Sequence, residues 1–184
     1  MNSLTEQQRA FLARFGFDPQ LQQKWQEDLA AGRLGPNGNA VEDPLLPPPP
    51  GSVHKLPGAT SSAHRELEQV GRTTIARGEL GVVLLNGGMA TRFCGVVKGT
   101  MPVVGRRSFL SLAFEDLLRH GDGNVPVFLM NSFATDTATR AHLDRHDHFG
   151  ADPALIEHFT QFIALRMTPR GELFRTADGE PSPY

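Results

Sequence analysis

A glycine turn followed by two cations is the part of this sequence best suited to chemistry on a phosphorylated ligand. The apolar run 81–85 predicts a buried strand that leads into Leu85, Asn86, Gly87 and Gly88. Two adjacent glycines let backbone N–H groups approach a bulky anion. Thr91, Arg92 and Lys98 follow, and the guanidinium and ammonium groups can neutralise phosphate charge. The segment therefore predicts a loop that holds a nucleoside triphosphate.

Two common phosphate-binding loops are excluded by spacing. In G-x-x-x-x-G-K-[ST] the lysine follows a glycine, whereas Lys98 precedes Gly99. The dinucleotide pattern G-x-G-x-x-G does not fit either, since residues 87–95 read GGMATRFCG. Neither pattern therefore explains this turn, which could also be an ordinary tight connection with a surface arginine.

A second apolar run, 125–131, ends in Met130 and Asn131 and is followed by Ser132. Buried parallel strands read as nearly continuous apolar runs, and α/β sheets place their ligands at the carboxyl ends of such strands. The run therefore reads as a buried parallel strand that delivers part of a site at its C-terminal end.

These two segments and Phe159-Thr160-Gln161 resemble, in the same order, the signature elements of the sugar-nucleotide pyrophosphorylases. The resemblance covers roughly residues 79–184 and is to the branch with the UTP–glucose-1-phosphate uridylyltransferases and UDP-N-acetylhexosamine pyrophosphorylases. It implies that Lys98 and Arg92 are catalytic and that the glutamine reads the uracil edge, where an amide offers both a donor and an acceptor. The implied nucleotide-binding set is Leu85, Asn86, Gly87, Gly88, Thr91, Met130, Asn131 and Gln161.

The same resemblance implies a Rossmann-like nucleotidyltransferase fold of the GT-A type, layered around a mainly parallel sheet. The implied reaction forms UDP-glucose and pyrophosphate from UTP and glucose 1-phosphate. Mg²⁺ is expected with UTP, although no protein ligand for it can be named. Asn86 and the Met130–Ser132 segment favour glucose, whereas Thr91-Arg92 with Lys98-Gly99 favour the alternative, a UDP-N-acetylglucosamine pyrophosphorylase activity.

The sequence also departs from the family pattern. Ala90 and Cys94 stand where relatives often carry glycine. Residues 181–184 resemble the sequence just before the Gly-His-Gly-Asp segment of the family, which does not follow here. We therefore expect the first portion of a longer enzyme, and a truncated nucleotide-binding module without turnover is a second interpretation.

Composition sets broader limits. The chain has 184 residues, 39% of them hydrophobic, and a net charge of −2 with both signs scattered, so neither nucleic acid nor an acidic membrane is favoured as a partner. A single cysteine cannot form an intrachain disulfide and fits a reducing compartment. No signal peptide or long apolar run is evident. We expect a cytoplasmic protein with small-molecule substrates and cannot infer its oligomeric state.

The chain divides by pattern into two parts. Residues 1–60 are predicted to hold two helices, the second with Leu21, Trp25 and Leu29 on one face, and a proline-rich linker. Residues 61–184 are predicted to form the N-terminal part of the catalytic domain.

Within that second part, three helices and three strands are expected to alternate. The helices cover 61–77, 108–118 and 135–148, and the strands cover 81–85, 125–131 and 156–165, with a hairpin tip at 169–171. Leu67, Val70 and Ile75 are expected to face inward from the first helix, and Phe109, Leu112, Leu117 and Leu118 from the second.

Two other interpretations of the sequence carry different chemistry. His142 and His146 lie four residues apart, as zinc ligands on a helix do, but a charged run at a helix end is more often solvated, so we predict no metal site there. The proline-rich segment and N-terminal helices could instead serve an interaction protein, in which case deleting residues 1–60 would leave nucleotide binding intact.

Overall fold

The computed structural model describes residues 4–35, 41, 43–88 and 96–184. It divides into two compact units, one formed by Met1–Ser52 with Phe162–Tyr184 and the other by Val53–Gln161. The final segment of the chain thus packs with the N-terminal helices rather than with the sheet. The domain boundary expected at residue 60 stays a prediction, because compactness alone does not define a functional domain.

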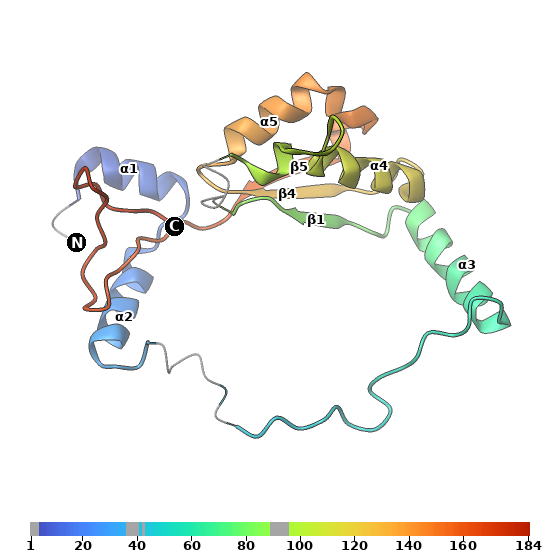
Figure 1. The fold of residues 1–184 in the computed structure, drawn as a ribbon, viewed down its shortest axis with the longest axis horizontal. Helices are drawn as coiled ribbons and strands as arrows, with labels where there is room; N and C mark the ends of the chain where they lie inside the picture. The colour runs from blue at the N-terminus through green and yellow to red at the C-terminus, as the bar shows by residue number, and fades with distance from the viewer. Residues whose placement is uncertain (1–3, 36–40, 42, 89–95) are drawn as a thin grey trace. The chain divides into compact units, whose positions relative to one another are not determined.

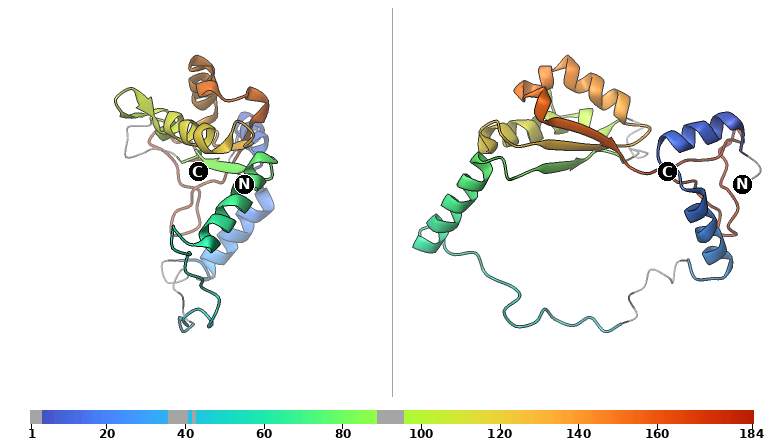
Figure 2. Two further views of the ribbon diagram at one scale, coloured as in Figure 1. Left: turned by 90° about the vertical axis from the view of Figure 1, so that its right-hand side faces the viewer. Right: turned by 180° about the vertical axis from the view of Figure 1, so that it is seen from behind.

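The second unit is built on a parallel sheet with strand order β1-β4-β5. The strands are β1 (Val82–Leu85), β4 (Val127–Asn131) and β5 (Ile156–Thr160). Helix α4 (Phe109–Gly121) leads from β1 to β4, and α5 (Asp136–Arg145) leads from β4 to β5. Because such crossovers are right-handed, both helices lie on one face of the sheet, as Figures 1 and 2 show. The expected α/β fold with a parallel sheet is confirmed.

Shorter elements complete this unit. Helix α3 (Ser62–Ala76) begins at its Ser61 cap and precedes β1. Between β1 and α4, the 3-10 turn Lys98–Thr100 is followed by the antiparallel pair β2 (Pro102–Val104) and β3 (Arg107–Ser108). Two further 3-10 turns, Asp147–Gly150 and Pro153–Leu155, join α5 to β5.

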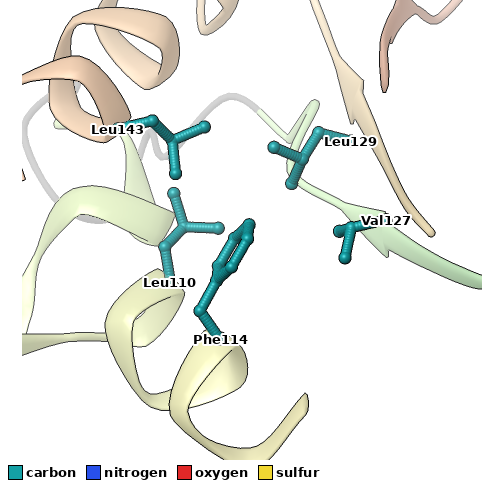
Figure 3. Packing of buried hydrophobic residues seen from close by; sticks show 5 residues of the cluster. All are labelled: Leu110, Phe114, Val127, Leu129 and Leu143. Carbon is teal, nitrogen blue, oxygen red and sulfur yellow. The ribbon is translucent and has the colours of Figure 1, made fainter. Parts of the chain in front are cut away.

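The core lies between the sheet and the two crossover helices. Its buried side chains are Leu110, Phe114, Val127, Leu129 and Leu143, which point toward one another in Figure 3. Leu110 and Phe114 are one helical turn apart, and it is their face of α4 that meets the sheet. The expectation that Phe109 faces the core is therefore wrong, since its side chain is 53% exposed.

Two other expectations about burial also fail. Leu67 and Val70 on α3 are exposed, and no residue of that helix is buried. The strand expected over 156–165 ends at Thr160, because Ile163 and Leu165 are buried in the other compact unit. An apolar pattern indicates that a side chain is buried somewhere, but it does not say against which element.

The first unit joins the two ends of the chain. Helix α1 (Glu6–Arg14) begins with a capping box between Thr5 and Gln8, and α2 (Pro19–Ala30) begins at its Asp18 cap. Against them lies the segment 162–184, folded back on itself by three isolated β-bridges, one of which flanks the predicted hairpin tip. None of the described helices combines the length and apolar character that a membrane crossing requires.

A buried glutamine ties α2 to this segment. The Nε2 of Gln22 donates to the carbonyl oxygen of Leu165 at 3.1 Å, and its Oε1 accepts from the Leu165 N–H at 3.1 Å. The side chain thereby pairs with a backbone as a neighbouring strand would. The face expected to be buried was that of Leu21, but Leu21 is 40% exposed while Gln22 is 1% exposed.

Candidate functional site

The carboxyl ends of the three parallel strands bring the predicted motifs together. The Asn86 N–H donates to the Met130 carbonyl at 2.8 Å, which extends the β1–β4 ladder by one residue. The Gln161 N–H donates to the Asn131 carbonyl, also at 2.8 Å. Three segments that are far apart in sequence therefore meet at one edge of the sheet, where open α/β sheets bind their ligands.

Gly87 lies directly beneath the Gln161 side chain. A Cβ at position 87 would lie 2.5 Å from Gln161 Oε1 and 3.0 Å from its Cδ. Glycine is therefore needed at position 87 to let the Gln161 side chain approach the backbone. It is not needed for an unusual backbone conformation, because Gly87 is not in the left-handed region. Gly88 is exposed, and a Cβ there would meet no atom of the described residues within 4 Å. Gly87 thus leaves room for the Gln161 side chain, whereas Gly88 is exposed to solvent.

A cleft opens beside Asn86. It has a volume of about 280 Å³ and is lined by Leu84, Leu85, Asn86, Lys98, Gly99, Phe109, Leu110 and Ala113. Lys98 is exposed at its rim. Gly99 is buried so tightly that a Cβ there would overlap Asn86 Oδ1 and lie 3.0 Å from Leu110 Cγ. The predicted catalytic lysine is thus placed next to the strand end that carries the glycine turn.

A polar network is centred on Asn86 and Asn131. Asn86 Nδ2 donates to Asn131 Oδ1 at 3.1 Å and to Thr139 Oγ1 at 2.6 Å. Asn131 Nδ2 in turn donates to Asp136 Oδ1 at 2.9 Å and to His158 Nδ1 at 3.1 Å. An amide nitrogen cannot accept, so His158 Nδ1 must be the acceptor and its proton sits on Nε2. The network therefore requires a neutral histidine.

Charge and burial set the protonation of the two titratable members. Burial raises the pKa of Asp136, but the hydrogen bonds from Arg140 and Asn131 outweigh it and hold the pKa below its ordinary 3.8. Burial, and then the nearby Arg140 charge, lower the pKa of His158 from 6.5, against the opposing influence of Asp136, Glu157 and Asp144. Both shifts favour the ionised carboxylate and the neutral imidazole that the network uses.

The predicted binding residues differ in what they offer a ligand. Leu85 is 76% exposed on the sheet face opposite Asn86, Met130 is half-buried, and Asn131 is fully buried with its amide groups already paired. Ala90, Thr91, Arg92 and Cys94 lie outside the described residues.

Sequence reasoning missed three members of the network, namely Thr139, Asp136 and His158. The only signal for Thr139 was its spacing four residues after Thr135, which places both on one face of α5. A polar residue on the core face of a helix is expected to have a buried partner.

The histidine pair at the C-terminal end of α5 has a structural role. His142 Nε2 lies 3.0 Å from Ser108 Oγ, the hydroxyl that caps α4, and its ring contacts that of His146. Burial and the neighbouring His146 lower the pKa of His142. Within residues 4–35, 41, 43–88 and 96–184, no group of three or more histidine, cysteine or acidic residues could hold a metal ion.

Comparison with known families agrees with this geometry. A family model described as UTP–glucose-1-phosphate uridylyltransferase matches residues 51–175, which is more than half of the chain. The chain belongs to this family. The matched residues contain every segment of the site, from the glycine turn to Gln161.

The chain is also similar to curated members of this uridylyltransferase family. It is 31% identical over 126 residues to the UDP-N-acetylglucosamine pyrophosphorylase of Saccharomyces cerevisiae, a match that spans 64% of this chain and 26% of the yeast protein. It is 31% identical over 144 residues to UDP-N-acetylglucosamine diphosphorylase 1 of Arabidopsis thaliana, spanning 70% of this chain and 28% of that protein. The chain thus spans little more than a quarter of the length of these relatives.

Solved structures show the same fold. The putative UDP-N-acetylglucosamine pyrophosphorylase of Entamoeba histolytica superposes with a TM-score of 0.59 at 20% identity, over 65% of this chain and 33% of that one. The uridine diphosphate N-acetylglucosamine pyrophosphorylase of Trypanosoma brucei gives 0.57 at 20% identity, over 65% and 26%. At this identity the likeness supports the fold, which is that of the nucleotidyltransferase pyrophosphorylases.

Proposed function

We propose that this chain carries the nucleotide-binding portion of a uridylyltransferase that makes a UDP-sugar and pyrophosphate from UTP and a sugar 1-phosphate. The observation that carries the proposal is the contact of Gly87 with Gln161, at the strand ends beside the cleft of Lys98. Gly87 and Lys98 belong to the glycine-turn segment and Gln161 to a second motif of the same family, and their proximity supports the proposal.

Uracil recognition falls to Gln161. Its amide offers one acceptor and two donors, which match the N3–H and the carbonyl oxygens of the uracil imide edge. The side chain rests on Gly87, and its backbone is held by Asn131. Cytosine presents the opposite pattern at N3 and C4, so an amide fixed in one orientation discriminates between the two pyrimidines.

Phosphate transfer needs positioning and charge neutralisation more than acid–base groups. An oxygen of the sugar 1-phosphate attacks the α-phosphorus of UTP, and pyrophosphate departs in line. In this proposal Lys98 neutralises charge that gathers on the phosphates, and Arg92 assists from the segment outside the described residues. Mg²⁺ is proposed to arrive with UTP. The described residues hold no cluster suited to bind it, so no protein ligand is assigned.

For the sugar, N-acetylglucosamine 1-phosphate is the better supported substrate. The relatives compared above carry UDP-N-acetylglucosamine in their names. Glucose 1-phosphate is the second candidate, because the matching family model is described by that activity and the Met130–Ser132 segment resembles its members.

The test has two stages, starting with a thermal-shift titration of the chain with Mg-UTP beside ATP, GTP and CTP. Selective stabilisation by UTP supports the uridine site, and no shift with any nucleotide contradicts the proposal. Pyrophosphate release is then measured with each sugar 1-phosphate. Binding without release would identify a nucleotide-binding module without turnover.

The variant for the second stage is Lys98→Ala. Its matched control is Lys55→Ala, which removes an exposed lysine that is distant from Lys98 in the sequence. Loss of a charge-neutralising group at the phosphates is expected to lower turnover by roughly 10²- to 10³-fold. Equal turnover of the two variants would remove Lys98 from the mechanism.

A further inference from the structure

We propose that Thr139 is a positioning residue for the turn Lys98–Thr100, which carries the proposed phosphate-binding lysine. It acts through the orientation of the Asn86 amide. The link to catalysis rests on the proposed function, because it assumes that Lys98 meets phosphate. The effect of Thr139 on the position of the Lys98 turn does not rest on that function, since it depends only on contacts among residues of one compact unit.

The Thr139 hydroxyl is fixed by its own hydrogen bonds. The residue is fully buried in α5, with 0% of its surface exposed. Its Oγ1 donates to the Thr135 carbonyl at 2.8 Å. A hydroxyl has a single hydrogen, so the lone pairs of Oγ1 are left to accept from Asn86 Nδ2 at 2.6 Å. Thr139 therefore presents Asn86 with an acceptor that cannot become a donor without losing its helix bond.

Two acceptors determine which way the Asn86 amide points. The Nδ2 group has two hydrogens, and they are directed to Thr139 Oγ1 and Asn131 Oδ1. The Asn131 oxygen is itself held in place, because the Asn131 nitrogen is directed to Asp136 and His158. Asn86 Oδ1 must then face away from α5. With Thr139 removed, one of the two hydrogens has no acceptor and the amide is held at a single point.

Asn86 Oδ1 packs against the turn Lys98–Thr100 at Gly99. A Cβ on Gly99 would overlap Asn86 Oδ1, so the Gly99 backbone and the Asn86 amide are in close contact there. Lys98 begins the turn that continues through Thr100, whose N–H and that of Met101 bond back to Val97 and Lys98 at 3.1 Å. A change in the Asn86 amide is therefore transmitted to this turn.

The experiment measures local backbone opening by amide hydrogen exchange in the full chain. Thr139→Val removes the hydroxyl at nearly constant volume, Thr139→Ser keeps it, and Thr137→Val is the matched control at an exposed position of the same helix. Exchange is followed at Asn86, Thr100 and Met101, with Leu129 in the core as the reference for global opening.

We expect roughly tenfold faster exchange at the three amides in Thr139→Val, as the loss of a buried hydrogen bond predicts. Thr139→Ser and Thr137→Val should match the wild type. Unchanged rates in Thr139→Val would overturn the proposal, as would a uniform rise that includes Leu129 or a serine variant that behaves like valine.

If Thr139→Val does not fold, Gly99→Ala tests the next contact in the chain of interactions, that between Asn86 Oδ1 and Gly99. Its Cβ would displace Asn86 Oδ1, so exchange at Thr100 and Met101 should rise, and wild-type rates would refute the proposal.

A UTP titration of the same variants separates this inference from the proposed function. A wild-type chain that does not bind UTP contradicts the proposed function and leaves the exchange result to decide the inference. If the wild type binds, Thr139→Val should bind several-fold more weakly and Thr139→Ser should recover; equal affinity for all variants would overturn the catalytic link.

Discussion

Gly87→Ala should separate nucleotide selectivity from stability. The new methyl would lie 2.5 Å from Gln161 Oε1, where ordinary contacts begin at 3.4 Å, so the amide must retreat by about 0.9 Å. It would also lie 3.3 Å from the Asn131 carbonyl carbon, which requires a shift of only a few tenths of an ångström. The side chain of Gln161 can rotate away, whereas the strand end can remain in place. We therefore expect the glutamine to leave its position while the fold survives.

The cost to stability is expected to be small. Alanine is allowed at this backbone conformation, and replacing glycine gains about 0.4–1 kcal/mol by restricting the unfolded chain. That gain offsets part of the strain from moving the half-buried Gln161 amide. Gly71→Ala, in α3 with no atom of the described residues near its new methyl, is the control for the entropic gain alone. Urea denaturation should place both variants within about 1 kcal/mol of the wild type.

The cost to UTP binding is expected to be larger. Losing one or two hydrogen bonds to the uracil edge weakens binding by about 10- to 100-fold. At a UTP concentration of 100 times the wild-type Kd, ligand stabilisation is about 2.7 kcal/mol, and it falls to about 1.4 or 0.4 kcal/mol for those two losses. A thermal-shift titration with UTP and CTP measures this, and the preference for UTP should disappear with the affinity.

A double-mutant cycle identifies the cause. If Gly87→Ala acts by displacing Gln161, it should add almost nothing in a Gln161→Ala background. Additive losses would mean that the methyl blocks the nucleotide directly. Retained UTP preference in Gly87→Ala would refute the reasoning, because the glutamine would then not need the space above Gly87.

Three further predictions concern the scaffold. Leu129→Ala should lower the free energy of unfolding by about 2–5 kcal/mol in urea denaturation, because the side chain is fully buried in the core. Since the pKa of His158 is lower in the folded chain than its ordinary 6.5, the unfolded state binds more protons below that pH, so stability should fall as the pH drops through 6.5, and His158→Gln should flatten this dependence. Gln22→Met should cost about 2–4 kcal/mol by leaving both Leu165 backbone groups unpaired, whereas the exposed Gln23→Met should stay within about 0.5 kcal/mol.

The elements of the sheet were predictable because each has a strong local signal. The apolar run before Gly87 and the run that ends at Asn131 are the strands β1 and β4, and Ser108 does cap α4. The convergence of these strand ends followed from parallel topology. Gln161 was named only through the family resemblance, because the strand was expected to run through it to residue 165, whereas β5 ends at Thr160.

The buried polar network could not be predicted, because it depends on pairings across the fold. Asn131 was expected to contact the nucleotide, yet its side chain is fully buried and bonded to Asp136 and His158. Nothing local distinguishes an asparagine that faces a ligand from one that supports the residues around it. Likewise, Leu165 continued an apolar pattern after β5 but is paired with Gln22 of α2, a partner that only tertiary structure could reveal.

The bond between Gln22 and Leu165 has a consequence for biosynthesis. The two residues are 143 positions apart, and the whole sheet unit lies between them in the chain. At typical translation rates of about 5–20 residues per second, roughly 7–30 s pass between the synthesis of Gln22 and that of Leu165. During that interval the Gln22 side chain of the nascent chain lacks its hydrogen-bond partner, the Leu165 backbone. The N-terminal helices, although synthesised before the sheet unit, can therefore complete their packing only after that unit has been made.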